Sequence, residues 1–296
     1  MDRFRASSLF QPTNFVAAIE SQHNVELDER PEHLFGAYLT IPHTQVARIM
    51  AVLGFDFIFV DTLHVPTDPG KLVDIIQTIN FASEGKTCAL VRIQSPESEF
   101  LAYALDAGAA GIIFPQIETA TEARAAVKKV RYAYSGGDRS VSPVALLDGI
   151  TNIAPPGWTA ETVADKNIAV ICQIENVLGI ENAHAIAKTP GVNGLMIGSG
   201  DLRASLGLPC RNPPGHREHP SFYAASAKLV AAAKSCGIPL MAPAFRADPD
   251  DIAWLRDFKM LITSVDALSI VKSHRQDLAA MKDKIIGCEH CHTNGF

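Results

Sequence analysis

The chain has 296 residues, of which 47% are hydrophobic and 20% are charged, and its formal net charge is −6. This composition lacks the basic surface of a nucleic-acid-binding domain, and no apolar run of roughly 18 residues or more predicts a membrane span. Six cysteines in a chain of this size do not indicate a disulfide framework. The first residues lack an apolar signal core, so we expect a cytoplasmic protein.

Residues 1–33 are predicted to be an N-terminal extension with one short helix over 14–21. From Leu34 onward, apolar runs alternate with segments of helical spacing. Strands are predicted at Leu34–Leu39, Asp56–Asp61, Cys88–Ile93, Gly111–Phe114, Ile168–Ile174, Gly194–Ile197, Ile238–Met241 and Lys259–Thr263. Helices are predicted between most of them, at Thr44–Leu53, Pro69–Phe81, Ser98–Ala107, Thr121–Tyr132, Ser221–Cys236 and Asp248–Asp257.

This alternation predicts an α/β fold, a (β/α)₈ TIM barrel over 34–285, ending in a helix over 266–284 and followed by a flexible tail over 286–296. An open doubly wound sheet is the alternative, but no GxGxxG follows the first strand. The pattern lapses between 139 and 166, where we expect the segment 148–158 to cover the barrel mouth. The tail contains a CxxCH sequence from Cys288 to His292 that could hold haem or zinc; we interpret it as a mobile polar terminus.

The most informative stretch covers residues 168–203. Its two apolar runs are each followed by a carboxylate, Glu175 and Asp201, and a helical segment of about 20 residues separates them. In such a strand–helix–strand unit both strand ends point the same way. Two carboxylates at one edge of a parallel sheet suit Mg²⁺ or Mn²⁺. The alternative interpretation is that both residues are helix N-caps.

Other polar residues follow the remaining strands. Because barrel active sites form at the C-terminal ends of the strands, these residues are expected to converge on one rim. They are Asp61, His64, Arg92, Gln116, Gln173, Glu175, Ser199 and Asp201. Each alone is more often a structural residue, so only their convergence points to a site.

The sequence resembles the HpcH/HpaI aldolase family, the metal-dependent class II pyruvate aldolases related to citrate lyase β-subunits. The resemblance lies in GFDFIFVDTLHVPTD (54–68), LVRI (90–93), LDAGAAGIIFPQIETATEA (105–123), QIEN (173–176) and GVNGLMIGSGDLRASLG (191–207), in the family's order. It implies a carbon–carbon lyase that cleaves or forms 4-hydroxy-2-oxo acids through a metal-bound pyruvate enolate. It also implies a 2-oxo acid and an aldehyde as substrates.

The resemblance assigns roles residue by residue. Glu175 and Asp201 look like ligands of a divalent metal, namely Mg²⁺, Mn²⁺ or Co²⁺. Arg92 looks like the residue that contacts the 2-oxo acid, and His64 with Asp61 looks like the catalytic dyad.

Three further positions match the family's substrate-binding residues, namely Gln173, Ser199 and Gly200. The backbone amides of Gly200 and Asp201 would hold the substrate carboxylate at the start of a helix. The family also implies a homo-oligomer, a hexamer or smaller, in which the C-terminal helices are exchanged.

The sequence departs from the family at two places. Leu63 stands where the family has an acid before the histidine, and the segment 132–140 lacks the family's glycine-containing loop, which usually shapes the aldehyde side of the pocket. These departures leave three alternatives open: a CoA-thioester lyase, an oxaloacetate-type decarboxylase on the same site, or a repurposed non-catalytic barrel.

Overall fold

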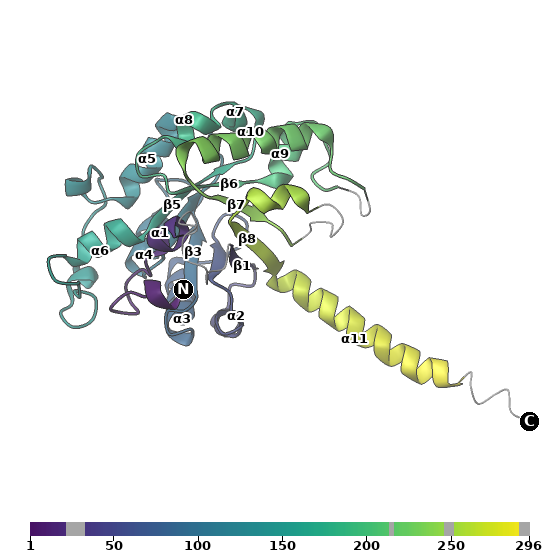
Figure 1. Cartoon of the computed structure of the whole chain (residues 1–296). Helices are drawn as coiled ribbons and strands as arrows, with labels where there is room; N and C mark the ends of the chain where they lie inside the picture. The colour runs from purple at the N-terminus through teal and green to yellow at the C-terminus, as the bar shows by residue number, and fades with distance from the viewer. Residues whose placement is uncertain (22–32, 213–215, 246–251, 290–296) are drawn as a thin grey trace, which may run out of the picture.

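The computed structural model describes residues 1–21, 33–212, 216–245 and 252–289, and it confirms the predicted barrel. Eight parallel strands close into a ring in the order β1 to β8, so that β8 pairs with β1 (Figure 1). The strands are β1 (Leu34–Leu39), β2 (Phe57–Asp61), β3 (Cys88–Arg92), β4 (Gly111–Phe114), β5 (Ala169–Ile174), β6 (Gly194–Ile197), β7 (Leu240–Pro243) and β8 (Met260–Val265).

Helices surround this ring and connect the strands. They are α1 (Phe15–Glu20), α2 (Thr44–Ala51), α3 (Pro69–Ala82), α4 (Glu99–Asp106), α5 (Ala120–Val130), α6 (Ala160–Asn167), α7 (Val177–Glu181), α8 (Ala183–Ala187), α9 (Ser199–Ser205), α10 (Pro220–Cys236) and α11 (Asp266–Glu289). Among the described helices, none is both long and apolar enough to cross a membrane.

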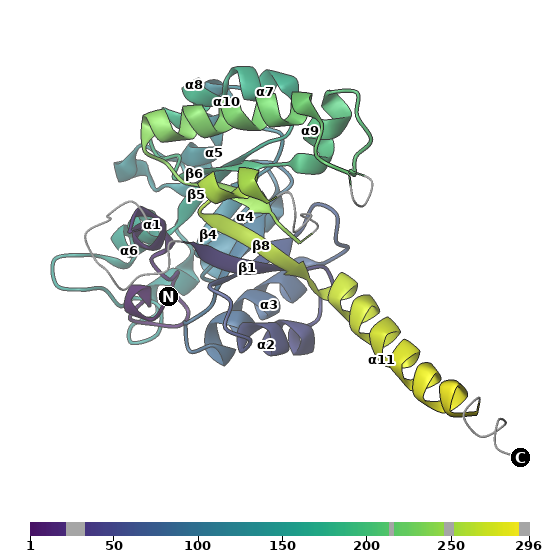
Figure 2. The same ribbon diagram turned by 45° about the vertical axis from the view of Figure 1, so that its right-hand side comes forward.

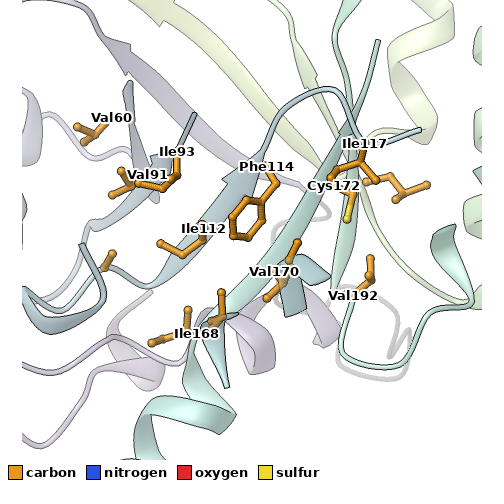
Figure 3. Packing of buried hydrophobic residues seen from close by; sticks show 14 of the residues in the cluster. Val60, Val91, Ile93, Ile112, Phe114, Ile117, Ile168, Val170, Cys172 and Val192 are labelled. Carbon is orange, nitrogen blue, oxygen red and sulfur yellow. The ribbon is translucent and has the colours of Figure 1, made fainter. Parts of the chain in front are cut away.

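Strand side chains alternate between two cores, as the period of two requires. In β2, Phe57 and Phe59 belong to a cluster inside the barrel, whereas Ile58 and Val60 belong to the outer cluster beneath the helices. Figure 3 shows part of the outer cluster, where Val60, Val91 and Ile112 come from adjacent strands. The same alternation directs Asp61 inward, because it lies two residues beyond Phe59, at the C-terminal end of β2.

The N-terminal extension contributes to the inner core. Asn14 caps α1 by accepting a hydrogen bond from the backbone N–H of Ala17 at 2.9 Å. On the buried side of this short helix, Phe15 and Ile19 pack with the inner cluster, and the Phe15 ring meets Phe57 edge-on at 6.0 Å. Because Phe57 is the first residue of β2, α1 closes the N-terminal end of the barrel.

The segment 148–158 lies at this same N-terminal end, so the prediction that it covers the barrel mouth is wrong. Gln11 donates from Nε2 to the carbonyl oxygens of Thr151 and Ile153, both at 2.7 Å, and Asn167, just before β5, donates to the carbonyl of Pro12 at 2.8 Å. The segment belongs to the connection between α5 and β5. In a barrel of this kind, the chain returns from each helix to the N-terminal end of the next strand, which is the end opposite the site.

Residues 132–140 follow the same rule. The backbone N–H of Asp138 donates to Lys128, and that of Arg139 donates to Arg131 at the end of α5, both at 2.9 Å. Within a single chain these contacts place residues 132–140, where the sequence departs from the family's loop, at the end of α5. The structure also adds α6, which the sequence interpretation missed, capped by Thr159.

The connection between β5 and β6 is not the single helix that was predicted. It consists of α7 and α8, separated at Asn182, whose side chain donates to the carbonyl oxygen of Glu118 at 2.9 Å. The predicted helix at Asp248–Asp257 lies partly outside the described residues, and its described end is a 3₁₀ turn at Ala253–Asp257.

The C-terminal helix α11 projects away from the barrel (Figures 1 and 2). Its first residue, Asp266, accepts hydrogen bonds from the backbone N–H groups of Thr40 and Ile41, which follow β1. Beyond this anchor the helix is exposed up to residue 286 and runs to Glu289, past the predicted boundary at 285. The CxxCH sequence begins in this last turn and continues outside the described residues.

Candidate active site

Asp61 and Arg92 form a buried ion pair where β2 and β3 end side by side. The strand register places the two residues opposite each other. Arg92 donates from Nε to Oδ1 of Asp61 at 2.8 Å and from Nη2 to Oδ2 at 2.7 Å. Tyr38, on the adjacent strand β1, donates from its hydroxyl to Oδ2 of Asp61 at 2.5 Å. Its oxygen also accepts a hydrogen bond from Nη2 of Arg92 at 2.8 Å.

This pair is ionised. Burial alone would raise the pKa of Asp61, but the hydrogen bonds and charge of Arg92 outweigh it and hold that pKa below its ordinary value. Burial would likewise lower the pKa of Arg92, and Asp61 reverses that effect. Burial also raises the pKa of Tyr38, so its hydroxyl stays protonated and remains a donor.

His64 does not form the predicted contact with Asp61 through its ring. Oδ2 of Asp61 accepts from the backbone N–H of His64 at 3.2 Å, and Oδ1 accepts from that of Leu63 at 2.9 Å. The His64 side chain is exposed, and within the described residues no hydrogen bond to its ring is formed. Asp61 therefore holds Arg92 and the following turn, and the ring of His64 stands at the rim without an orienting carboxylate.

Gln173 links Arg92 to the first predicted metal ligand. It lies on the inner side of β5, and its Oε1 is 3.5 Å from Nη1 of Arg92. Its Nε2 donates to Oε2 of Glu175 at 2.6 Å. The other oxygen of Glu175 accepts the backbone N–H of Gln116 at 2.7 Å. A continuous hydrogen-bonded row thus runs from Tyr38 to the loop after β4.

Two backbone features allow the Glu175 carboxylate to lie where it does. Gln116 has a φ of +54°, a left-handed conformation that is uncommon for a non-glycine residue. A side chain at Gly198 would place its Cβ 2.4 Å from Cβ and 2.5 Å from Oε2 of Glu175. The residue after β6 must therefore be glycine for the Glu175 carboxylate to occupy its place.

Glu175 carries a charge that the protein does not match. Burial, helped by the negative charge of Asp201, raises the pKa of Glu175 to about 7. These effects outweigh the hydrogen bonds from Gln116 and Gln173 and the positive charge of Arg92, which lower that pKa. Among the described residues, no cation lies within ion-pair distance of Glu175. A divalent cation between the two carboxylates would remove both penalties.

Asp201 and its neighbours belong to α9. Gly198 precedes this helix, and Asp201 lies in its first turn, where it makes no capping hydrogen bond. Asn176, rather than Glu175, caps α7 by accepting from the N–H of Gly179 at 2.8 Å. Neither carboxylate is a helix N-cap, so the alternative interpretation is wrong. The first-turn N–H groups, including those at Ser199 and Gly200, have no acceptor within the helix.

These residues fit a magnesium-type ion. Such an ion is commonly held by one or two carboxylates, and a substrate and waters complete its coordination. The described residues contain no group of three or more His, Cys, Asp or Glu side chains that could hold a metal, at this site or elsewhere. Glu175 and Asp201 would supply two such carboxylates, and carboxylate oxygens are the hard ligands that this class of ion prefers.

Two residues of this arrangement were not given a role by the sequence interpretation. Tyr38 could have been found from the alternation of β1, because Leu34 and Tyr38 share the inward side with Gly36. Gly198 could have been found as the residue between the sixth strand and the helix that carries Asp201. Fold and site together define an enzyme-type (β/α)₈ barrel with an acidic site at the C-terminal ends of its strands.

Comparison with known proteins narrows this class. The HpcH/HpaI aldolase/citrate lyase family profile matches residues 34–257. The chain is 33% identical, over 84% of its length and 93% of the relative's, to a hydroxypyruvate/pyruvate aldolase of Paraburkholderia phytofirmans. It is 30% identical to a 5-keto-4-deoxy-D-glucarate aldolase of Klebsiella pneumoniae, over 78% and 83% of the two lengths.

A solved structure agrees. Macrophomate synthase superposes with a TM-score of 0.83 at 31% identity, covering 96% of this chain and 94% of the other. The chain therefore belongs to the HpcH/HpaI aldolase/citrate lyase family, as the sequence interpretation stated.

Proposed function

We propose that the protein is a class II aldolase, a divalent-metal-dependent lyase that cleaves or forms 4-hydroxy-2-oxo acids through a pyruvate enolate. The observation that carries this proposal is the unmatched carboxylate of Glu175, beside Asp201 and linked through Gln173 to the buried Asp61–Arg92 pair. The hydroxypyruvate/pyruvate aldolase relative supports a 2-oxo acid as substrate.

Glu175 and Asp201 would hold Mg²⁺, Mn²⁺ or Co²⁺, which supplies Lewis acidity that favours the enolate over the keto form. Arg92 presents a fixed positive charge whose attraction grows as the substrate oxygen becomes negative. The amides of Gly200 and Asp201 would bind the substrate carboxylate, with Ser199 and Gln173 beside it.

His64 would carry the proton of the acceptor's hydroxyl. Its exposed ring at the rim suits exchange with a bound aldehyde and with solvent. This assignment differs from the expected dyad, because Asp61 is committed to Arg92. General acid–base catalysis by one group is typically worth about 10²–10⁴-fold.

The direct test is deuterium exchange at the methyl group of pyruvate, with each metal in turn and with a chelator as the control. We expect metal-dependent exchange, and cleavage activity in a panel of aldehydes. Oxaloacetate decarboxylation and CoA-thioester cleavage are separate arms, because they would use the same enolate chemistry. Folded protein without any metal-dependent exchange would overturn the proposal in favour of a non-catalytic barrel.

A pair of variants separates recognition from proton transfer. Arg92→Lys keeps the charge but loses the planar fork, so it should impair both exchange and cleavage. His64→Ala should reduce cleavage by about 10²–10⁴-fold and leave pyruvate affinity, measured by calorimetry with metal, nearly unchanged. The reverse pattern would mean that the two roles are exchanged.

We further propose a homo-oligomer in which α11 packs against a second copy, a hexamer or smaller. Leu268, Val271, Leu278 and Met281 on this projecting helix are 41–57% exposed. Spacings of three and seven residues place them along one side of a helix, the pattern of a packing face. Light scattering at micromolar concentration should give a multiple of 31.9 kDa. A monomer would contradict the assembly.

A further inference from the structure

Tyr38 stands at the start of the hydrogen-bonded row, and no motif gives it a role. We propose that Tyr38 is a positioning residue for Arg92, whose hydroxyl fixes the guanidinium so that Nη1 alone is offered to the reacting molecule. This inference rests on the proposed function, in which Arg92 meets the substrate.

The geometry is a closed triangle. Nη2 of Arg92 donates both to Oδ2 of Asp61 at 2.7 Å and to the hydroxyl of Tyr38 at 2.8 Å. The same hydroxyl donates to Oδ2 of Asp61 at 2.5 Å. Each of the three groups therefore fixes the other two.

The donors of Arg92 can be accounted for one by one. A guanidinium has five N–H groups in a rigid fork. Asp61 accepts the N–H of Nε and one N–H of Nη2. The hydroxyl oxygen of Tyr38 accepts the second N–H of Nη2. The two on Nη1 remain, and their nearest acceptor in the protein is Oε1 of Gln173, at the limiting distance of 3.5 Å. Nη1 lies on the side of Gln173, whose other end binds Glu175.

The tyrosine ring is held independently of its hydroxyl. It meets the Phe59 ring edge-on, with 4.8 Å between the centroids and 89° between the planes. The Arg92 guanidinium carbon lies 5.3 Å from the centroid of the Phe59 ring. A phenylalanine at position 38 would therefore keep this packing and remove only the two hydrogen bonds of the hydroxyl.

Loss of the hydroxyl leaves one N–H of Nη2 without its acceptor, and Asp61 without one of its donors. Asp61 alone then holds the guanidinium, less rigidly than the closed triangle does, so a smaller fraction of molecules presents Nη1 correctly. The substrate carboxylate would still bind at the start of α9. The rate of enolate formation should fall, whereas the binding of pyruvate should not.

The experiment compares the wild type with Tyr38→Phe in metal-dependent pyruvate proton exchange. We expect kcat to fall about 10- to 100-fold, the range for a lost hydrogen bond to a charged group, with KM nearly unchanged. Tyr132→Phe is the matched control, because Tyr132 is also buried but lies at the end of α5, and it should exchange at the wild-type rate. Equal kcat in wild type and Tyr38→Phe would overturn the inference.

A double variant distinguishes positioning from general loss of structure. If Tyr38 acts through Arg92, Tyr38→Phe should cost little further activity in an Arg92→Lys background. Fully additive losses would mean that Tyr38 acts by another route.

A second readout does not depend on activity. The rate at which phenylglyoxal modifies Arg92 in the metal-free protein can be followed by mass spectrometry of its peptide. The rate should rise in Tyr38→Phe and stay unchanged in Tyr132→Phe. If the wild type shows no pyruvate exchange, the proposed function fails, and this measurement alone decides the inference. An unchanged modification rate would overturn it.

Discussion

Asp61 ends β2 and Glu175 directly follows β5, and both are buried carboxylates, with 2% and 5% of their surfaces exposed. Asp61 faces Arg92, which holds its pKa below the ordinary value despite burial. Glu175 has no ion-pair partner among the described residues, and burial outweighs the more distant charge of Arg92 and raises the pKa of Glu175 to about 7. The charge of Asp61 is paired within the chain, whereas that of Glu175 has no ion-pair partner among the described residues.

The difference follows from what each strand presents. β3 ends on an arginine in register with Asp61, so the two charges meet within the sheet. The residue in register with Ile174 at the end of β5 is Ile197, and the glycine after it leaves room for Glu175 without offering a charge. A buried charge without a partner is costly, and it persists in folded proteins where function uses it.

The largest effect that sharpens this comparison is on turnover. Glu175→Gln keeps the shape of the side chain but cannot supply a negative ligand. Metal-dependent exchange should fall by at least about 10³-fold, because Lewis-acid stabilisation is typically worth several kcal/mol. Asp201→Asn should behave in the same way. Wild-type activity in either variant, after chelation and metal add-back, would contradict the site assignment.

The second effect is on the free energy of unfolding, which neutralising substitutions at Asp61 and Glu175 should change in opposite directions. Asp61→Asn leaves Arg92 buried without its counter-charge, which should cost about 3–5 kcal/mol. Glu175→Gln removes an unmatched charge, so the metal-free protein should be as stable as the wild type or more stable at about pH 8. Urea unfolding in the presence of a chelator measures both. Equal destabilisation by the two variants would remove the distinction drawn between Asp61 and Glu175.

A third test concerns the space around Glu175. Gly198→Ala would bring a Cβ to 2.5 Å from Oε2 of Glu175 and must displace the carboxylate. Metal affinity should fall about 10- to 100-fold, as when a group that orients a ligand is changed. Gly200→Ala is the control for metal affinity, because its nearest contact would be 3.9 Å away. Calorimetric titration with Mn²⁺ would show the difference, and equal affinities would contradict the role of Gly198.

Much of this arrangement could be predicted from the sequence. The alternation of apolar runs and helical segments predicted the barrel. The positions of the polar residues at the ends of the strands predicted that they lie at one end of it. The sequence interpretation nevertheless paired Asp61 with His64 and overlooked what the alternation says of Arg92. His64 lies beyond the strand, where the alternation no longer decides direction, whereas Arg92 lies within β3 and must point inward with Leu90.

For the segment 148–158, its place in the order of strands and helices is more informative than its length. Its length suggested a cover for the site, but its place between α5 and β5 already puts it at the opposite end of the barrel. The direction of α11 is different again. Its apolar spacing predicts a packing face, and in the part of the chain that the structure describes this face is exposed along most of the helix.

The smallest expected effect is the pH dependence of stability in the metal-free protein. In the unfolded chain Glu175 ionises near its ordinary pKa of 4.5, and in the folded protein near 7. Between these values the folded state binds the extra proton, so the free energy of unfolding decreases as pH rises. The stabilising contribution of protonated Glu175 is complete below the lower value and is lost as pH rises through the upper one.

Glu175→Gln should abolish this contribution. With chelator, the wild type should lose more stability than the variant between about pH 5.5 and about pH 8, by on the order of 1 kcal/mol. Asp61 has the opposite sign, since its lowered pKa contributes stability that is lost only on acidification. Added Mg²⁺ should reverse the trend at Glu175, because the metal binds the ionised form and displaces the proton. Parallel pH profiles for wild type and Glu175→Gln would show that the pKa of Glu175 is not raised in the folded protein. They would also mean that other groups of the chain compensate the charge of Glu175.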